Sequence, residues 1–124
     1  MGKRSRRKGG GSDLPSIPDA EHELPSGGSL RLKCVMSLKT RAQYESVRSG
    51  LDDRPGASRE DAWQRAVEFL FERLVNGWTV AGVDYSEQKE LLMRFRVASQ
   101  EERAEVRDAM RAHLADWFPE MTAP

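Results

Sequence analysis

The chain has 124 residues, of which 38% are hydrophobic and 32% charged, and its 20 Lys and Arg are balanced by 20 Asp and Glu. This length predicts one domain, alone or with an appendage. The single cysteine, Cys34, excludes an intrachain disulfide and fits a reducing compartment. No apolar run approaches the roughly 20 residues that span a bilayer, and no apolar segment follows the basic start as in a secretory signal. We therefore expect a cytoplasmic protein that does not enter a membrane.

The charges at the N-terminus are unevenly distributed. Residues 1–12 contain cations and no acid, whereas residues 13–29 contain acids and no base. Residues 1–29 are also rich in Gly and Pro, which favours a flexible arm because so few apolar side chains cannot offset the ordering entropy. The alternative is a solvated tail with no specific task. The candidate non-specific phosphate contacts on this arm are Lys3, Arg4, Arg6, Arg7 and Lys8.

A period-two pattern begins at residue 30. It predicts a β-strand with one buried face. The opposite face is basic, small or polar, apart from one valine. The apolar positions are Leu30, Leu32, Cys34, Met36 and Leu38, and the intervening ones include Arg31, Lys33, Val35 and Ser37.

Two helices are expected after this strand. Thr40 and Gln43 have the spacing of a capping box, and a turn follows near residues 50–56. Ser58 is the expected N-cap of the second helix, and Asn76–Gly77 is its expected stop. The expected core-facing side chains are Tyr44, Val47 and Leu51 in the first helix and Trp63, Val67, Leu70 and Leu74 in the second.

Residues 78–124 are expected to form a helical extension. Ser86 is a candidate cap for a helix that continues to about residue 98. Ser99 with Glu102 makes a second capping box, and Pro119 ends the helix that it opens. The chain is thus divided into an arm (1–29), a compact unit (30–77) and an extension (78–124).

A lone strand leaves its backbone hydrogen-bonding groups unpaired, and a unit over residues 30–77 is small for a self-sufficient core. Pairing of the strand with its counterpart in a second copy would answer both difficulties, and two-fold dimers are the commonest oligomers. The sequence therefore favours a mainly α-helical homodimer with one short strand per chain.

Residues 30–38 and 55–70 resemble the strand, turn and second helix of the ribbon-helix-helix family of DNA-binding proteins. The resemblance implies an intertwined dimer with an intermolecular antiparallel β-ribbon in the major groove of double-stranded DNA. Outward ribbon residues would then contact base edges. These residues are Arg31, Lys33, Val35 and Ser37.

The resemblance also implies a phosphate clamp at the start of the second helix, at Ser58 and Arg59. Arg54 adds a flanking charge, and Lys39 is a further phosphate candidate that joins the reading face if the strand extends through Leu38.

The first functional hypothesis is a sequence-specific, dimeric transcriptional repressor that assembles further on DNA. The alternatives are a plasmid partition protein with an ATPase partner, a relaxosome accessory protein with a relaxase partner, and an antitoxin whose residues 78–124 bind a toxin. His22 and His113 have no Cys, Asp or His partner at metal-ligand spacing, and no catalytic motif is present. We therefore expect no metal, no cofactor and no enzymatic activity.

Overall fold

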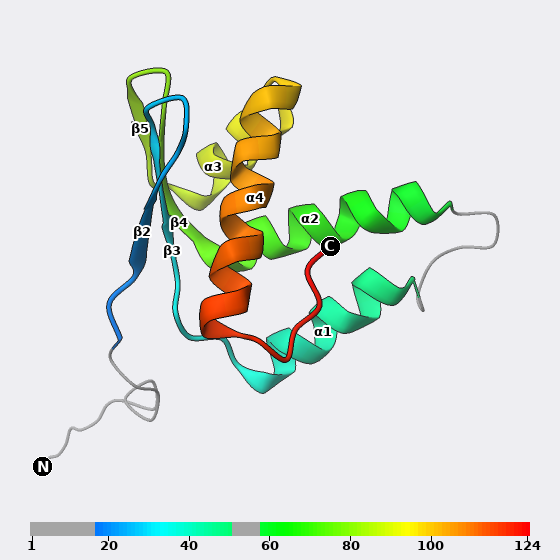
Figure 1. The fold of residues 1–124 in the computed structure, drawn as a ribbon. Coiled ribbons are helices and arrows are strands. Elements are labelled where there is room, and N and C mark those ends of the chain that lie inside the picture. The colour runs from blue at the N-terminus through cyan, green and yellow to red at the C-terminus, as the bar shows by residue number, and fades with distance from the viewer. Residues whose placement is uncertain (1–16, 51–57) are drawn as a thin grey trace, which may run out of the picture.

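The computed structural model describes residues 17–50 and 58–124. These residues form a four-stranded antiparallel sheet, in the order β2-β3-β4-β5, and four helices (Figure 1). The predicted DNA contacts Arg54, Lys3, Arg4, Arg6, Arg7 and Lys8, and the predicted core residue Leu51, lie outside the described residues. The strands are β2 (Ala20–Glu23), β3 (Ser29–Leu32), β4 (Val75–Val80) and β5 (Val83–Tyr85). The helices are α1 (Leu38–Ser49), α2 (Arg59–Leu74), α3 (Gln88–Arg96) and α4 (Gln100–Trp117).

The predicted fold class, a mainly helical ribbon-helix-helix dimer with one short strand, is wrong. β3 is an inner strand that pairs with β2 on one side and β4 on the other, all within one chain. Both of its hydrogen-bonding edges are therefore occupied, and none is left for the same strand of a second copy. Residues 20–23, which we placed in the N-terminal arm, supply one of these neighbours.

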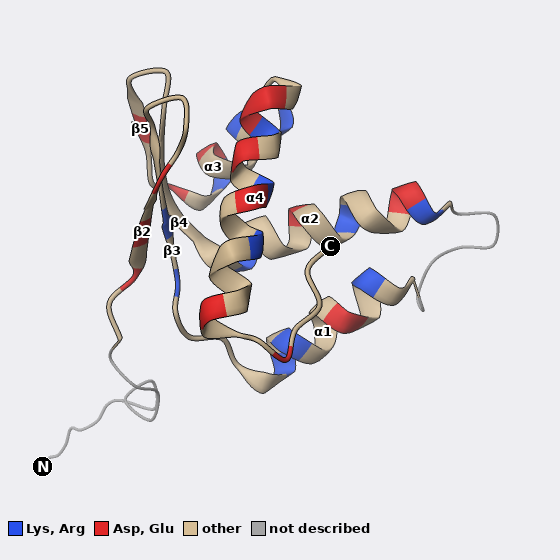
Figure 2. Ribbon diagram, viewed as in Figure 1, with Lys and Arg blue, Asp and Glu red and all other residues tan. Residues whose placement is uncertain are grey.

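The sheet has one covered and one open face, with all four helices on the same side (Figure 1). Leu30, Leu32, Trp78 and Val80 are buried beneath the helices. The alternating positions carry polar side chains, and exposed charges mark the strands in Figure 2. The protein is thus a two-layer α/β structure, with a core between sheet and helices.

The helices begin largely where side-chain caps were expected. Ser58 and Asp61 form a capping box at α2, and Ser99 and Glu102 form the predicted one at α4. α1 starts earlier than expected, because Ser37 rather than Thr40 is its N-cap. α2 ends at Leu74 and leads directly into β4, so the expected stop at Asn76–Gly77 lies inside a strand.

The segment after α4 returns to α1 (Figure 1). The hydroxyl of Tyr44 donates a hydrogen bond to the carbonyl oxygen of Thr122 at 2.6 Å. Arg41 forms an ion pair with Glu120, and its guanidinium lies 5.1 Å from the ring centroid of Phe118. Burial raises the pKa of Tyr44 to about 12, so this hydroxyl stays protonated and able to donate. The C-terminal segment therefore belongs to the folded unit.

Replacement of Ser99 by Ala tests the cap of α4. The Ser99 hydroxyl accepts a hydrogen bond from the Glu102 N–H at 3.1 Å, so Ser99→Ala should lower the free energy of unfolding by about 1 kcal/mol in urea denaturation. Ser86→Ala is the matched control, because Glu87 is the N-cap of α3 and that helix has no side-chain cap. Equal losses in the two variants would contradict the capping role.

Candidate functional site

Arg31 and Lys33, two predicted base contacts, form hydrogen bonds within their own sheet. Arg31 Nε lies 3.7 Å from Asp19 Oδ2, and an Arg31 Nη2 hydrogen bond reaches the carbonyl oxygen of Asn76 at 3.2 Å. Lys33 follows β3, and its N–H donates to the carbonyl oxygen of Leu74 at 2.9 Å. These two residues therefore do not lie on a β-ribbon formed between two copies of the chain.

The other predicted base contacts, Val35 and Ser37, lie in the irregular segment between β3 and α1. The Ser37 hydroxyl accepts a hydrogen bond from the Thr40 N–H at 3.1 Å, so it serves as a helix cap. Lys39, the predicted phosphate contact, is exposed in the first turn of α1. The four base-contact candidates therefore do not form one row on one strand.

The predicted phosphate clamp at the start of α2 is filled by the protein's own carboxylates. Ser58 caps the helix, and the Asp61 carboxylate accepts a hydrogen bond from the Ser58 N–H at 3.2 Å. Glu60 stands in the same turn. Arg59 is exposed beside them. An incoming phosphate would meet two negative charges here, which opposes the attraction of the helix N-terminus.

The open face of the sheet is also unsuited to DNA. Glu21 and Glu23 on β2 and Asp84 on β5 are exposed there, and Arg31, a cation on this face, is close to Asp19. A face with this excess of carboxylates repels a phosphate backbone. This face of the sheet is therefore a poor candidate for a nucleic-acid interface.

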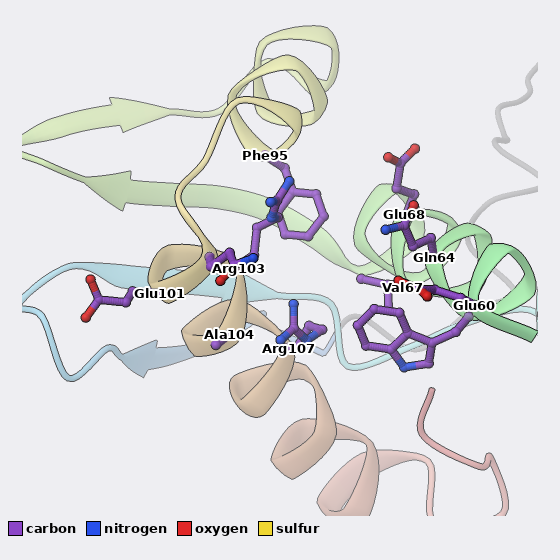
Figure 3. Close-up of a pocket in the computed structure, with 11 residues that line it drawn as sticks. Glu60, Gln64, Val67, Glu68, Phe95, Glu101, Arg103, Ala104 and Arg107 are labelled. Carbon is purple, nitrogen blue, oxygen red and sulfur yellow. The ribbon is translucent and has the colours of Figure 1, made fainter.

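A pocket of about 560 Å³ lies between α2 and α4, bordered by the C-terminal end of α3 (Figure 3). Its apolar lining comes from Val67 on α2, Phe95 on α3 and Ala104 on α4. Val67 and Phe95 also belong to the buried core, so this part of the pocket is anchored in the body of the protein. Trp63 lies at the pocket with 37% of its surface exposed, although we expected it in the core.

Two arginines of α4 supply the positive charge of this pocket. Arg103 and Arg107 stand one helical turn apart and are both partly buried. The Arg107 guanidinium lies 5.0 Å from the ring centroid of Trp63. Figure 3 shows both arginines between α4 and the side of α2 that carries Val67, with Glu101 pointing away at one end.

Arg103 and Arg107 differ from the nearby arginines of α3 in their ion pairs. Arg94 pairs with Glu102 at 3.0 Å, and Arg96 pairs with Glu68 at 2.9 Å. Across residues 17–50 and 58–124, neither Arg103 nor Arg107 forms an ion pair with a carboxylate. The pocket thus holds two cationic groups that are available to an anionic ligand.

The junction between α3 and α4 fixes the position of the basic wall. The Glu102 carboxylate accepts hydrogen bonds from Arg94 and from the Ser99 N–H, at 3.0 Å each. The bond from Arg94 and then the one from Ser99 lower the pKa of Glu102 below its ordinary value of 4.5. Glu102 therefore stays ionised at neutral pH and ties the start of α4 to α3.

Sequence reasoning missed this pocket because it depends on how α2 and α4 diverge. Its one local signal is the recurrence of arginine at every fourth position of the last helix, at Arg103, Arg107 and Arg111. That spacing puts the three on one helix face. Arg111, the third, pairs with Asp108 and lies outside the pocket.

Comparisons of the chain with protein-family models, curated proteins and solved structures found no match in any of the three. Within the described part of the chain, no helix is long and apolar enough to cross a membrane. The same residues contain no group of three or more His, Cys, Asp or Glu side chains arranged to hold a metal ion. The α2–α4 pocket, with Trp63 and its two arginines, is the candidate functional site.

Proposed function

We propose that this protein is a protein-binding module whose α2–α4 pocket accepts a short segment of a partner. The segment inserts an apolar side chain over Val67 and Phe95 and places a neighbouring Asp or Glu beside Arg103 and Arg107. The observation that carries the proposal is this arginine pair beside Trp63, partly buried and without a carboxylate partner among the residues that the structure describes.

The composition of the pocket favours a peptide over a nucleic acid. Arg103 and Arg107 line the α4 side together with Glu101, and Glu60 and Glu68 line the α2 side. A peptide can present charges of both signs, whereas a nucleic acid backbone is uniformly negative and would be repelled by the α2 side. Trp and Arg are also the side chains that most often carry the binding energy of protein interfaces.

The experiment uses a display library of random peptides, selected on the full-length protein. We expect the enriched sequences to share an apolar residue close to an Asp or Glu. A synthetic peptide with the enriched sequence is then titrated by fluorescence anisotropy. Trp63→Ala and Arg107→Ala should each weaken its binding by about 2 kcal/mol, or roughly thirtyfold.

The same helical layer offers matched controls. Trp117 is exposed on α4 outside the pocket, and Arg111 lies one turn beyond Arg107 and is paired with Asp108. Trp117→Ala and Arg111→Ala should bind the peptide as tightly as the unmodified chain. No enrichment, or equal weakening by the pocket and control substitutions, would contradict the proposal.

DNA binding remains a prediction with a narrower basis. A β-ribbon mechanism is excluded because β3 has partners on both sides, and the remaining support is the run of cations at residues 3–8. Anisotropy of a labelled DNA duplex in a salt series measures this contribution, because binding by the arm should weaken steeply as salt rises. Removal of residues 1–12 should abolish such binding and leave peptide affinity unchanged.

The antitoxin alternative assigned toxin binding to residues 78–124, and this segment contains α4, which carries Arg103 and Arg107. The repressor, partition, relaxosome and antitoxin roles each remain predictions.

A further inference from the structure

The two histidines of the chain, 91 positions apart in the sequence, meet between the sheet and the helical layer. His22 on β2 and His113 on α4 approach to 3.0 Å between Nε2 of His22 and Nδ1 of His113. Their rings are arranged edge to face, with centroids 5.1 Å apart. His113 is fully buried and His22 partly so. This contact links the first strand of the sheet to the last helix.

A backbone carbonyl determines the proton positions in this pair. His113 Nε2 lies 2.7 Å from the carbonyl oxygen of Lys33, which can only accept a hydrogen bond. Nε2 must therefore carry a hydrogen. In neutral His113, Nδ1 is then an acceptor, and the Nε2–H of His22 donates to it. Both short contacts are satisfied when the two imidazoles are neutral.

The pair tolerates one additional proton but not two. With one, either imidazole can donate across the 3.0 Å contact while the other presents a bare nitrogen. With two, both facing nitrogens carry hydrogen, and two cations meet in a partly buried place. We propose that His22 and His113 form an acid-sensitive latch, which holds the edge strand β2 against α4 and opens when both imidazoles are protonated.

The surroundings of the latch resist charging of His113. Burial lowers its pKa below the ordinary value of 6.5, and the charge of His22 acts in the same direction. The hydrogen bond to Lys33 and the carboxylates of Asp116 and Asp19 act in the opposite direction without outweighing burial. Because the folded protein then binds fewer protons than the unfolded chain, the stabilisation is present above pH 6.5 and is lost as the pH falls below it.

The β2–β3 loop and β3 are held on the helical layer independently of the histidines, because Leu24, Leu30 and Leu32 are buried in the same cluster as Val106 and Met110 of α4. The Ser26 hydroxyl donates to Glu105 at 2.8 Å, at the exposed tip of the hairpin. This hydrogen bond does not involve either imidazole. Opening should therefore loosen β2 near His22 before the whole protein unfolds. This behaviour does not depend on peptide binding at the α2–α4 pocket.

Amide hydrogen exchange of the full chain at pH 5 and pH 7 tests the latch. The protection factors of β2 amides should be lower at pH 5 than at pH 7, because the open form binds protons that the closed pair excludes. The β4–β5 pair is the internal control, because it contains no histidine. Its protection factors should change much less.

His22→Gln is the matched variant. Its amide can donate to neutral His113 or, after rotation, accept from the protonated form, so the pair never holds two cations. We expect the pH-dependent loss of β2 protection to disappear in this variant. An equal loss in both proteins, or none in the unmodified chain, would overturn the proposal.

Titration of the unmodified protein, followed through the imidazole signals in NMR spectra, is a second measurement. It does not depend on the folding of any variant. The chain contains two histidines, so the signals are few and assignable. We expect the two imidazoles to titrate as a coupled pair, so that protonation of one shifts the signals of the other. Two independent titrations, with no effect of one ring on the other, would overturn the latch.

Discussion

Replacement of Phe71 by Ala should lower the free energy of unfolding by about 3–5 kcal/mol. Phe71 is 1% exposed. Its ring stacks on Phe95 with centroids 4.5 Å apart and meets the edge of Trp78 at 5.9 Å. The substitution leaves a cavity where α2, α3 and β4 converge and removes both aromatic contacts. A domain is typically stable by about 5–15 kcal/mol, so much of the total would be lost.

Denaturant unfolding of Phe71→Ala and Phe69→Ala measures this effect. Phe69 lies on the same helix but is only partly buried, with Arg73 4.9 Å from its ring centroid. Phe69→Ala should therefore cost roughly 1–2 kcal/mol. Similar losses in the two variants would mean that the aromatic cluster is not the centre of the core.

Replacement of Gly28 by Ala should also destabilise the fold strongly, by about 3 kcal/mol. Gly28 precedes β3 and faces β4, where an added Cβ would overlap the backbone carbonyl oxygen of Thr79. A backbone atom in a paired strand cannot move aside independently. The substitution should therefore separate β3 from β4 near Thr79 and weaken the sheet at its inner pair.

Gly77→Ala is the comparison for this prediction. A Cβ at Gly77 would meet the guanidinium of Arg31, which is the mobile end of an exposed side chain. Rotation of that side chain relieves the overlap, so the loss should be about 1 kcal/mol or less. Thermal unfolding of both variants measures the difference. Equal midpoint temperatures for Gly28→Ala and Gly77→Ala would contradict the idea that overlap with a backbone atom costs more than overlap with a mobile side chain.

The helices were more predictable than the sheet. Caps such as Ser58 and Ser99 act through neighbouring residues, so their signals lie within a few positions of each other. β2 and β4 lack such local signals. β2 contains Glu21 and Glu23 and little apolar alternation, and β4 contains Asn76 and Gly77, which resemble the end of a helix.

The period-two pattern from residue 30 correctly located a strand but overstated its length. β3 ends at Leu32, where its register with β4 shifts. Leu38, the last apolar position of the pattern, is 80% exposed at the start of α1. The main error concerned the partner of the strand, since β4 lies more than forty residues downstream. Pairing over such a distance depends on the tertiary fold, which local periodicity does not encode.

The candidate site was the least predictable part. Trp63 lies on the same helix as Val67 and Leu70, so its spacing predicts burial, but it stands where α2 diverges from α4. The accessibility of Arg103 and Arg107 likewise depends on where the carboxylates of other elements lie. Sequence spacing shows which residues share a helix face, but not which face remains uncovered.

The direct passage from α2 into β4 has a mechanical consequence. Val75 is both the C-cap of α2 and the first residue of β4, and its N–H still donates to the carbonyl oxygen of Phe71. Because no linker separates α2 from β4, α2 cannot rotate without displacing β4, an inner strand of the sheet. We therefore expect the pocket to keep its conformation on binding, so that the incoming segment, rather than this protein, changes shape.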